Sequence, residues 1–564
     1  MSDAEADVIV VGSGAGGLSA AVTAARLGLS VLVIEKSGLV GGTTARSGGV
    51  LWLPGNPVAA RAGVTDDVPA ARSYMHAMAG NCFDAERVDS FLSNGPEMVD
   101  FFERETRVAF VAQPGFPDYN ADRPGASAGG RSIVAAPMDG RELGREIRRL
   151  RPPLREITFV GMMFNASQEV QHFFRATRSL TSALYVARRL AVHGWEMLRH
   201  GRAMRLTNGN ALAARLFASA LDLGVQIRTG TGLVELIERG GRAVGVLTDG
   251  GERLFARHAV VLAAGGFPRG IARQQRLFPH VAAGGQHLSP APDSNQGDTL
   301  TAGESIGARV RDDLPNAAAW IPVSAVPRGK GPHGVFPHLI DRYKPGIIAV
   351  DPWGRRFVNE ANSYHDFGQA MLERCRRDGR VYAWLIADHR ALRRYGLGIV
   401  KPFPVPYGGW IRSGYLRRGR TVAELARAIA CEPESLDATL ARFNLDAAKG
   451  EDTQYGKGST PYNRYLGDPG HLPNACIAPL DQAPFFAVKL EMGDLGTFAG
   501  LATDARARVL NAAGAPIPGL YAVGNDAASV MGGAYPGGGI TLGPAMTFGY
   551  IAARTIASDA GLEN

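Results

Sequence analysis

The first residues of the chain contain a strand–turn–helix–strand pattern that constrains the fold more than any other feature. The apolar run 8–11 leads directly into residues 12–17, which match G-x-G-x-x-G, and an alanine-rich stretch then continues to about Leu27. A second apolar run, 31–34, follows. Continuous apolar runs are typical of parallel strands that are buried on both faces. The order of these elements therefore predicts a Rossmann-like unit at the start of a parallel sheet.

The glycines of this turn have the positions that a dinucleotide requires. Gly12 allows the tight turn, Gly14 lets the backbone approach a pyrophosphate, and Gly17 lets the helix pack on the strand. The N-terminus of that helix favours the phosphate charges. Glu35 ends the second strand, where a carboxylate can accept hydrogen bonds from a ribose and repels a 2′-phosphate. Strands, glycines, helix and acid occur in the order that a nucleotide site needs.

Three further glycine-bearing segments favour FAD over NAD. Residues 41–49 form a second loop rich in glycine and hydroxyl groups, close behind the ribose acid. Far downstream, residues 263–267 and 519–525 each place glycines directly after an apolar run. Such segments bring bare backbone against a ligand. One nicotinamide site does not need chain from both ends of the sequence, so the pattern indicates the longer flavin cofactor.

Composition excludes several classes of protein. The chain has 564 residues, is 45% hydrophobic, and its 61 basic against 53 acidic residues give a formal net charge of +8. This is a globular composition with room for two to four domains. The four cysteines form no C-x-x-C pair, which argues against zinc ribbons and iron–sulfur clusters. The start carries acids where a signal peptide needs positive charge, and no run of 18 apolar residues follows, so we expect a cytoplasmic protein.

The sequence resembles the flavoprotein superfamily of fumarate reductases and succinate dehydrogenases, and within it the 3-ketosteroid Δ1-dehydrogenases. The most specific segment is the C-terminal run 493–547, which contains Y-P-G-x-G; the second is 41–49, G-G-T-T-A-R-S-G-G. The resemblance covers nearly the whole chain and is weakest in 150–206. It implies an α/β fold in which a Rossmann-like FAD-binding domain carries an inserted α+β substrate domain.

The resemblance also implies a reaction and the residues that perform it. Family members convert a 4-en-3-one steroid into a 1,4-dien-3-one by removing a proton from C2 and transferring a hydride from C1 to flavin N5. Tyr535 and Gly539 fall where the family polarises the C3 carbonyl. Tyr364 matches the catalytic base and Tyr119 its supporting tyrosine. The substrate-binding residues implied are Phe116, Tyr119, Tyr364, Tyr535, Gly539 and Ile540.

The FAD contacts are expected at both ends of the chain, and no metal site is expected. Succinate dehydrogenases bind flavin covalently through a histidine; Gly42 occupies that position here, so the FAD should be non-covalent. One departure from the family pattern is Gly538, where we expect proline and therefore a looser loop. The expected cofactor-binding residues are Gly12, Ser13, Gly14, Ala15, Gly16, Gly17, Glu35, Lys36, Gly41, Gly42, Thr43, Thr44, Ala45, Ser47, Gly48, Gly49, Leu233, Ala264, Gly265, Gly524, Asn525, Thr541 and Leu542.

The residue types suit this chemistry. A proton at C2 is acidic only if the carbonyl oxygen can take up negative charge, and a phenol with a backbone amide forms an oxyanion hole. Free tyrosine has a pKa near 10, so Tyr364 is a poor base at neutral pH unless its phenolate is stabilised, for example by a hydrogen bond from Tyr119. This predicts activity that rises above neutral pH. A neutral, tyrosine-lined site fits an apolar ketone.

The chain is expected to divide into three segments. Residues 1–275 begin the FAD-binding domain, 276–484 form the substrate domain, and 485–564 complete the FAD-binding domain. Within the first segment, a strand-rich part over 225–261 is predicted, with a turn at 239–242. The active site is expected between the domains.

Residues 154–206 form a basic amphipathic insertion with eight arginines against three glutamates. Such a stretch can lie in a membrane interface or pack on a subunit, and the sequence leaves both alternatives open. The apolar residues at roughly helical spacing are Val170, Phe173, Phe174, Leu180, Leu184, Tyr185, Leu190, Trp195 and Leu198.

Other functions remain open at this point. Within enzymes, the alternatives are a 3-ketosteroid Δ4-(5α)-dehydrogenase or another flavin ene-reductase. From another class, the alternative is a membrane-docked electron-transfer flavoprotein subunit. The expected partners are a 3-ketosteroid and an external electron acceptor, quinone-like or a dye, with no nucleic acid. We expect the protein in the cytoplasm. If 154–206 binds lipid, we expect it to attach peripherally to the inner face of the cell membrane.

Overall fold

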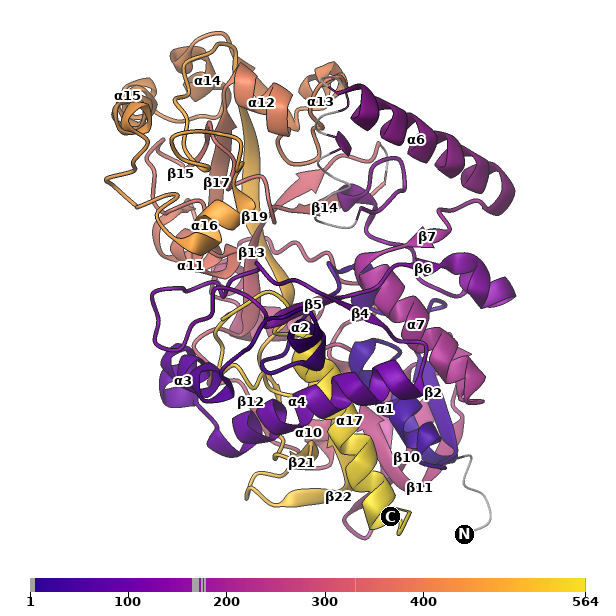
Figure 1. The fold of residues 1–564 in the computed structure, drawn as a ribbon. Coiled ribbons are helices and arrows are strands. Elements are labelled where there is room, and N and C mark those ends of the chain that lie inside the picture. The colour runs from indigo at the N-terminus through magenta and orange to yellow at the C-terminus, as the bar shows by residue number, and fades with distance from the viewer. Residues whose placement is uncertain (1–5, 165–171, 174–175, 177–178, 330, 563–564) are drawn as a thin grey trace.

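The computed structural model describes residues 6–164, 172–173, 176, 179–329 and 331–562. It consists of two sheet-containing regions, one above the other in Figure 1, with both chain ends at the lower one. The predicted positions Val170, Phe174, Arg175 and Arg178 lie outside the described residues.

The lower region is built on a mainly parallel sheet. Its path runs β21-β22-β11-β1-β2-β8, and the hairpin β9–β10 extends from β11. All six residues of β1 are buried, as expected where helices cover both faces of a parallel sheet. These strands are β1 (Ala6–Val11), β2 (Val31–Glu35), β8 (Gln226–Thr229), β9 (Leu233–Arg239), β10 (Arg242–Thr248), β11 (Arg253–Leu262), β21 (Arg508–Leu510) and β22 (Pro516–Ala522).

Strand register brings the predicted cofactor segments to one edge of this sheet. In the parallel pairs, Val11 lies beside Ile34 on β2 and beside Leu262 on β11, and Leu262 lies beside Ala522 on β22. The loops that follow these strands therefore leave the sheet side by side, although they are distant in sequence. Helix α1 (Ala15–Arg26) packs against α7 (Asn208–Asp222) and the C-terminal helix α17 (Leu542–Asp559). The predicted Rossmann-like α/β unit is confirmed.

The upper region is an antiparallel sheet covered by helices. Its path is β14-β13-β19-β17-β15, with β16 and β18 attached to β17 and β19. The strands are β13 (Ala318–Val326), β14 (Gly334–Pro337), β15 (Ile347–Val350), β16 (Arg376–Arg377), β17 (Arg380–Ala387), β18 (Leu416–Gly419) and β19 (Phe485–Thr497). The helices that bear on the site are α11 (Tyr364–Arg374) and α16 (Pro461–Leu466).

Strand β19 bears on where the inserted domain ends. It pairs with β13, β17 and β18 along its length, so it is a central strand of the upper sheet. The sequence analysis assigned residues from 485 onward to the FAD-binding domain. We propose instead that the inserted domain runs from β13 through Thr497 and that the FAD-binding domain resumes after it.

Helix α6 (Leu180–His200) projects along one side of the upper region (Figure 1). It begins at Ser179, whose hydroxyl accepts the Ser182 N–H, and ends at Gly201, which has left-handed backbone angles. Only Ser182 and His193 of its residues are buried. The helix predicted within 154–206 is thus present over these residues. Among the described residues, none of the helices combines the length and apolar character needed to cross a membrane.

Candidate active site

The turn after β1 leaves no room for side chains. Gly12 has φ of 110°, and a Cβ on it would lie 2.3 Å from the carbonyl oxygen of Ala263. A Cβ on Gly17 would lie 2.1 Å from the carbonyl oxygen of Gly12. Both positions therefore require glycine, one for its backbone angles and close approach, the other for close packing. The geometry matches the role that the sequence predicts for this turn.

The second glycine loop closes over the N-terminus of α1. The Thr44 Oγ1 accepts the Ala15 N–H at 2.9 Å, and a Cβ on Gly42 would lie 3.5 Å from the Gly14 Cα. Asn295 donates to Thr43 Oγ1 at 3.2 Å and to the Gly265 carbonyl at 3.4 Å. These contacts bring the predicted segments 12–17, 41–45 and 264–265 together. A helix N-terminus framed by glycines is suited to an anionic pyrophosphate.

Glu35 ends β2 at the same edge. Its Oε2 accepts the N–H and the hydroxyl of Ser13, at 3.0 and 2.7 Å, and its Oε1 accepts the Ser37 N–H at 2.9 Å. These bonds fix the carboxylate next to the glycine turn. The neighbouring Lys36 pairs with Asp298 at 2.7 Å. Leu233, the other predicted contact on this side, is buried at the start of β9.

We call residues 12–17, 41–45 and 264–266, together with Glu35, the cradle. Asp526 is a buried residue in contact with it that the sequence analysis did not identify. Its two carboxylate oxygens accept the N–H groups of Ala264 and Gly266, at 2.6 and 2.7 Å. Burial raises the pKa of Asp526, and these amide bonds act in the opposite direction. It follows Gly524 and Asn525 in the sequence, and an acid just beyond a parallel strand is the signal that could have identified it.

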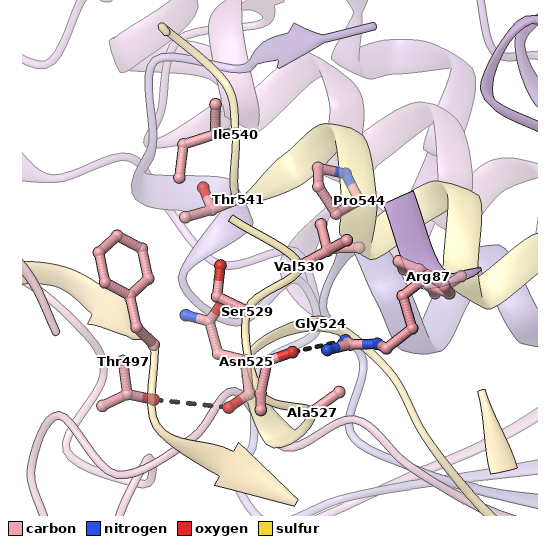
Figure 2. A pocket seen from close by; sticks show the side chains of 14 residues that line it. Arg87, Thr497, Gly524, Asn525, Ala527, Ser529, Val530, Ile540, Thr541 and Pro544 are labelled. Atoms are coloured by element: carbon pink, nitrogen blue, oxygen red, sulfur yellow. Dashed lines mark hydrogen bonds between the residues drawn. The ribbon is translucent and has the colours of Figure 1, made fainter. Parts of the chain in front are cut away.

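A cavity lies at the start of α17, where residues 524–530 meet Arg87, Thr497 and Phe498 (Figure 2). Of the predicted residues, Gly524, Asn525, Ile540 and Thr541 line it. Arg87, also in its wall, donates to the Ala528 carbonyl at 2.6 Å, and its Nε is buried without a hydrogen-bond partner. The lining residues that the sequence analysis did not identify are Arg87, Thr497, Phe498, Ala527, Ala528, Ser529, Val530, Pro544, Ala545 and Phe548.

These residues fit FAD. The turn at Gly12 and Gly17 lets β1, α1 and the loop after β11 approach closely, and Glu35 is fixed beside that turn, where a dinucleotide fold recognises a ribose. Asn525 and Thr541, which are also predicted cofactor contacts, line the cavity. The Nε of Arg87, buried without a hydrogen-bond partner in the cavity wall, gives the site a positively charged donor.

Three tyrosines from distant parts of the chain meet beside this cavity. The hydroxyls of Tyr119 and Tyr364 are 3.2 Å apart and hydrogen-bonded. The Tyr535 ring stacks on Tyr119, with centroids 5.7 Å apart, and meets the Tyr364 ring edge-on at 4.9 Å. The structure therefore brings together all three tyrosines that the sequence predicted for the substrate. We call Tyr119, Tyr364 and Tyr535 the tyrosine cluster.

Local contacts explain how each tyrosine is held. Tyr364 is the first residue of α11, whose N-cap Ser363 accepts the Asp366 N–H. The Tyr119 N–H donates to the Pro536 carbonyl at 2.9 Å, which ties it to the loop of Tyr535. The hydroxyl of Tyr74, which the sequence analysis did not identify, donates to the same carbonyl at 2.7 Å.

The glycines after Tyr535 pack closely on their surroundings. Gly539 has φ of 103°, and its Cβ would lie 2.6 Å from the Trp52 nitrogen, so only glycine fits. A Cβ on Gly538 would lie 2.5 Å from the Phe116 ring and 3.1 Å from the Tyr119 hydroxyl. The predicted residue Phe116 borders the tyrosine cluster, with its ring centroid 6.2 Å from that of Tyr119, whereas Gly539 packs on the backbone of residues 50–52. With Phe116 in this position, the proline expected at 538 would collide with its ring.

Burial dominates the acid–base properties of the cluster. It raises the pKa of Tyr364 well above the ordinary value, and the neighbouring phenols Tyr119 and Tyr535 raise it further. Burial likewise raises the pKa of Tyr535, to about 12. At neutral pH all three hydroxyls are therefore protonated in the free protein. Tyr535 is suited to donate a hydrogen bond, whereas Tyr364 needs a stabilising charge to act as a base.

Known proteins resemble this chain over nearly its whole length. A family model for the FAD binding domain matches residues 7–542. The 4-oxocyclohex-2-ene-1-carboxylate 5-dehydrogenase of Sinomonas cyclohexanicum is 42% identical, over 98% of this chain and 93% of its own. A 3-oxosteroid 1-dehydrogenase of Mycolicibacterium smegmatis is 36% identical, over 99% and 98%. The crystal structure of the 3-ketosteroid Δ1-dehydrogenase of Sterolibacterium denitrificans with 1,4-androstadiene-3,17-dione superposes with a TM-score of 0.90, at 36% identity over 98% of this chain and 99% of that one.

The cradle and the family match over most of the chain define an FAD-dependent oxidoreductase. More narrowly, the chain belongs to the 3-ketosteroid Δ1-dehydrogenase family. The resemblance, the α/β class and the FAD cofactor predicted from the sequence are confirmed.

Proposed function

We propose that this enzyme removes hydrogen from C1 and C2 of 3-ketosteroids, converting a 4-en-3-one into a 1,4-dien-3-one. The observation that carries the proposal is the tyrosine cluster, in which Tyr119 and Tyr364 share a hydrogen bond beside Tyr535 and the cofactor cradle. The bound FAD supplies the oxidant that accepts the hydride. The alternatives of a Δ4-(5α)-dehydrogenase, an ene-reductase or an electron-transfer subunit are less favoured, because the relatives at 36–42% identity are ring dehydrogenases.

The residues divide the work at the ketone. Tyr535 keeps its proton, because burial raises its pKa to about 12, and donates it as a hydrogen bond to the substrate carbonyl. The N–H of Gly539 is the second donor, on a backbone that has no side chain to obstruct it. Together they stabilise the enolate oxygen, and loss of one such donor typically costs about 10²–10³ in kcat.

Proton removal from C2 is assigned to Tyr364. Its partner Tyr119 lies within hydrogen-bond distance and can stabilise the phenolate when Tyr364 gives up its proton. Burial opposes that ionisation, so turnover should increase as the pH rises above neutral. The low polarity of the cluster favours an uncharged ring system over a dicarboxylate.

A second candidate substrate is a monocyclic oxocyclohexane carboxylate. The relative of 42% identity is a 4-oxocyclohex-2-ene-1-carboxylate 5-dehydrogenase, and its ring poses the same chemical problem as steroid ring A. A substrate panel tests both. The purified holoenzyme with a dye acceptor should convert 4-androstene-3,17-dione at least about tenfold faster in kcat/KM than 4-oxocyclohex-2-ene-1-carboxylate. The opposite ranking would assign the enzyme to the monocyclic acid.

The cofactor should be bound non-covalently and reoxidised by an external acceptor. Gly42 offers no side chain for a flavin bond, so acid precipitation should release all of the FAD into the supernatant. Flavin that stays with the pellet would contradict this. A quinone-like acceptor suits a lipid-soluble substrate, and rates with quinones of different tail length, compared with a dye, would test that preference.

We further propose that the enzyme is cytoplasmic and attaches peripherally to an anionic membrane through α6. The outward face of this helix carries apolar side chains, including Trp195, which is 64% exposed, and Leu198, which is 86% exposed. Arg188 and Arg199 flank them and are also exposed. A basic helix with an apolar face suits anionic lipid, whereas a second copy would bring like charges together.

Liposome sedimentation tests the attachment. Binding to anionic vesicles should weaken as salt rises but persist through the apolar face, since screening acts only on the charges. The pair Arg188→Gln and Arg199→Gln should reduce binding, and Trp195→Ala should remove the part that resists salt. Turnover of a soluble steroid should stay unchanged in these variants. A protein that ignores anionic vesicles at low salt would contradict the proposal.

A further inference from the structure

Arg342 is a fully buried cation that has no acidic partner at close range. Its side chain is completely shielded from solvent. The guanidinium donates to the carbonyls of His338 and Glu360, at 2.9 and 2.6 Å, to that of Asn362 at 3.3 Å, and to the Tyr343 hydroxyl at 3.2 Å. Among the described residues, no carboxylate lies within 4 Å of it.

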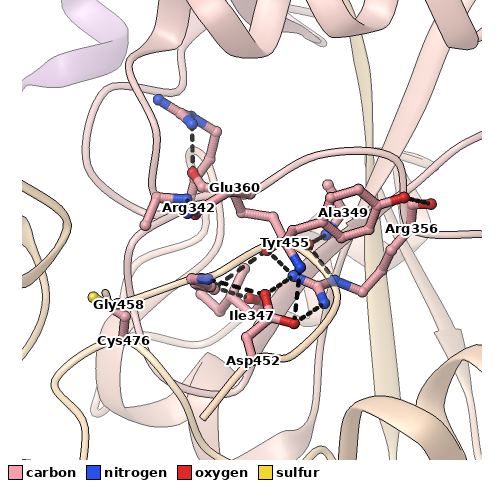
Figure 3. A network of polar contacts seen from close by, with 12 residues as sticks. Arg342, Ile347, Ala349, Arg356, Glu360, Asp452, Tyr455, Gly458 and Cys476 are labelled. Atoms are coloured by element: carbon pink, nitrogen blue, oxygen red, sulfur yellow. Dashed lines mark hydrogen bonds and ion pairs between the residues drawn. The ribbon is translucent and has the colours of Figure 1, made fainter. Parts of the chain in front are cut away.

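The neighbouring Arg356 shows what a compensated buried arginine looks like (Figure 3). It is equally buried, but its Nη2 pairs with Glu360 at 2.7 Å and with Asp452 at 2.8 Å. Desolvation of a buried charge costs several kcal/mol. In the part of the chain that the structure describes, Arg342 has no carboxylate to offset that cost: its guanidinium contacts neutral oxygens and the rings of Tyr343 and Phe367, each with its centroid 4.9 Å away.

A line of phenols leads from Arg342 to the tyrosine cluster. The Tyr343 hydroxyl is 2.7 Å from that of Tyr462. Tyr462 lies on α16 and packs against the Tyr119 ring, with centroids 4.4 Å apart. Tyr119 in turn bonds Tyr364 at 3.2 Å. Two hydrogen bonds and one ring contact thus connect four buried phenols.

We propose that Arg342 is a positioning residue that supplies the positive charge needed to form a phenolate in the tyrosine cluster, acting through Tyr343 and Tyr462. The proposal rests on the proposed function, in which Tyr364 is the base. This charge would explain how Tyr364 can form a phenolate, since burial alone would keep every phenol of the cluster protonated. When Tyr364 gives up its proton to solvent water, the remaining phenols orient toward the new negative charge, and Arg342 supplies the positive charge at the far end of the line.

The charges around Arg342 support a role in stabilising a phenolate. Its positive charge acts to lower the pKa of Tyr343 and of Tyr462, against the stronger effect of burial. Of the two nearby acids, Asp341 is engaged by His338 at 2.7 Å. Asp366, on α11, has its pKa raised by burial to about 6, and Arg342, Asp122 and Arg123 also act on it. Above that pH, Asp366 offsets part of the positive charge but does not contact it.

Arg342 also has a mechanical effect that a test must separate from its charge. Its bonds to the carbonyls of Glu360 and Asn362 hold the segment that directly precedes Tyr364. A variant could therefore lower turnover by displacing the base. A displaced base changes the rate at every pH, whereas a lost charge moves the pH at which the rate rises.

The experiment compares pH–rate profiles of the holoenzyme with 4-androstene-3,17-dione and a dye acceptor. In Arg342→Gln, the midpoint of the alkaline rise in kcat should move up by about one pH unit or more, with roughly a tenfold loss at pH 7. Arg342→Lys keeps the charge and should stay near the wild-type midpoint. Arg356→Lys is the matched control: it perturbs an equally buried arginine and should lower stability without moving the midpoint.

Tyr343→Phe breaks the line without removing the guanidinium or its bonds to the carbonyls. The midpoint of the alkaline rise in kcat should also move up in Tyr343→Phe. If Arg342→Gln does not fold, the Tyr343→Phe profile alone tests the proposal. A wild-type midpoint in Tyr343→Phe and in a folded Arg342→Gln would overturn the inference and leave Arg342 as a structural clamp. The proposed function fails separately, if Tyr364→Phe retains wild-type turnover or if no 3-ketosteroid is oxidised.

Discussion

The cofactor end and the substrate end of this site are built in opposite ways. The cradle uses backbone: Gly12 and Gly17 are required because a Cβ at either would strike a carbonyl oxygen. The tyrosine cluster uses side chains, which converge from a loop, the start of α11 and the segment before α17. The cradle should therefore be sensitive to added atoms, and the cluster to the loss of single hydroxyl groups.

The largest effect should come from removing one oxygen at the substrate end. Tyr364→Phe keeps the ring but loses the proton acceptor, so kcat should fall by about 10³ or more, with FAD content and steroid affinity retained. Tyr521→Phe is the matched control, since Tyr521 is also buried and hydrogen-bonded, to Asp559, but lies in β22. Comparable turnover of the two variants would show that Tyr364 is not the base.

A smaller loss is expected when the oxyanion donor is removed. Tyr535→Phe should lower kcat by about 10²–10³, because the Gly539 amide remains to polarise the ketone. The alkaline rise of the pH–rate profile should persist, as Tyr364 is still present. A loss confined to KM would mean that Tyr535 only binds the substrate.

At the cofactor end, one added methyl group should be enough to weaken FAD binding. Gly12→Ala should weaken FAD binding by at least about 100-fold, measured by fluorescence titration of the apoenzyme, because its Cβ meets the Ala263 carbonyl. Gly28→Ala is the control: Gly28 also has positive φ, 91°, but a Cβ there meets nothing within 4 Å. Equal weakening in both variants would attribute the effect to backbone strain rather than to the cradle.

The smallest effect on turnover should come from breaking the buried ion pair between Arg356 and Asp452. Burial alone would raise the pKa of Asp452, but Arg356 outweighs it and lowers that pKa to about 2. Its stabilisation is therefore present above the unfolded pKa near 4 and is lost as the pH falls through about 2. Asp452→Asn should cost about 3 kcal/mol or more of unfolding free energy at pH 7, with kcat changed less than about threefold. A wild-type melting temperature would show that the pair is dispensable.

The sequence predicted the residues of the cradle more completely than the residues that hold it in place, such as Asp526. Gly12, Gly14, Gly17 and Glu35 follow one another in a single βαβ unit, where local spacing is sufficient. Asp526 was missed because its role depends on a loop that is remote in sequence, 264–266. The register of β11 against β22 creates that contact, and the local signal, an acid directly after a parallel strand, does not show which loop it binds.

The prediction of the substrate-end residues depended on a family resemblance rather than on spacing in the sequence. Tyr119, Tyr364 and Tyr535 were identified by family motifs, and the structure places them in contact. Tyr462 and Arg342 lie behind them without any motif, and only tertiary packing makes them neighbours. The pairing of β19 with β13 and β17, on which our proposed domain boundary rests, likewise joins strands that are distant in sequence.

We expect the tyrosine cluster and the FAD cradle to act together in desaturating the ring beside a ketone. The direct measurement is anaerobic mixing of the holoenzyme with one equivalent of 4-androstene-3,17-dione, with flavin absorbance and product mass followed together. The flavin should bleach and a 1,4-dien-3-one should form in equal amount, whereas the Tyr364→Phe enzyme should bleach at least about 10³-fold more slowly. Flavin that stays oxidised, or a product altered at any other carbon pair, would contradict the claim.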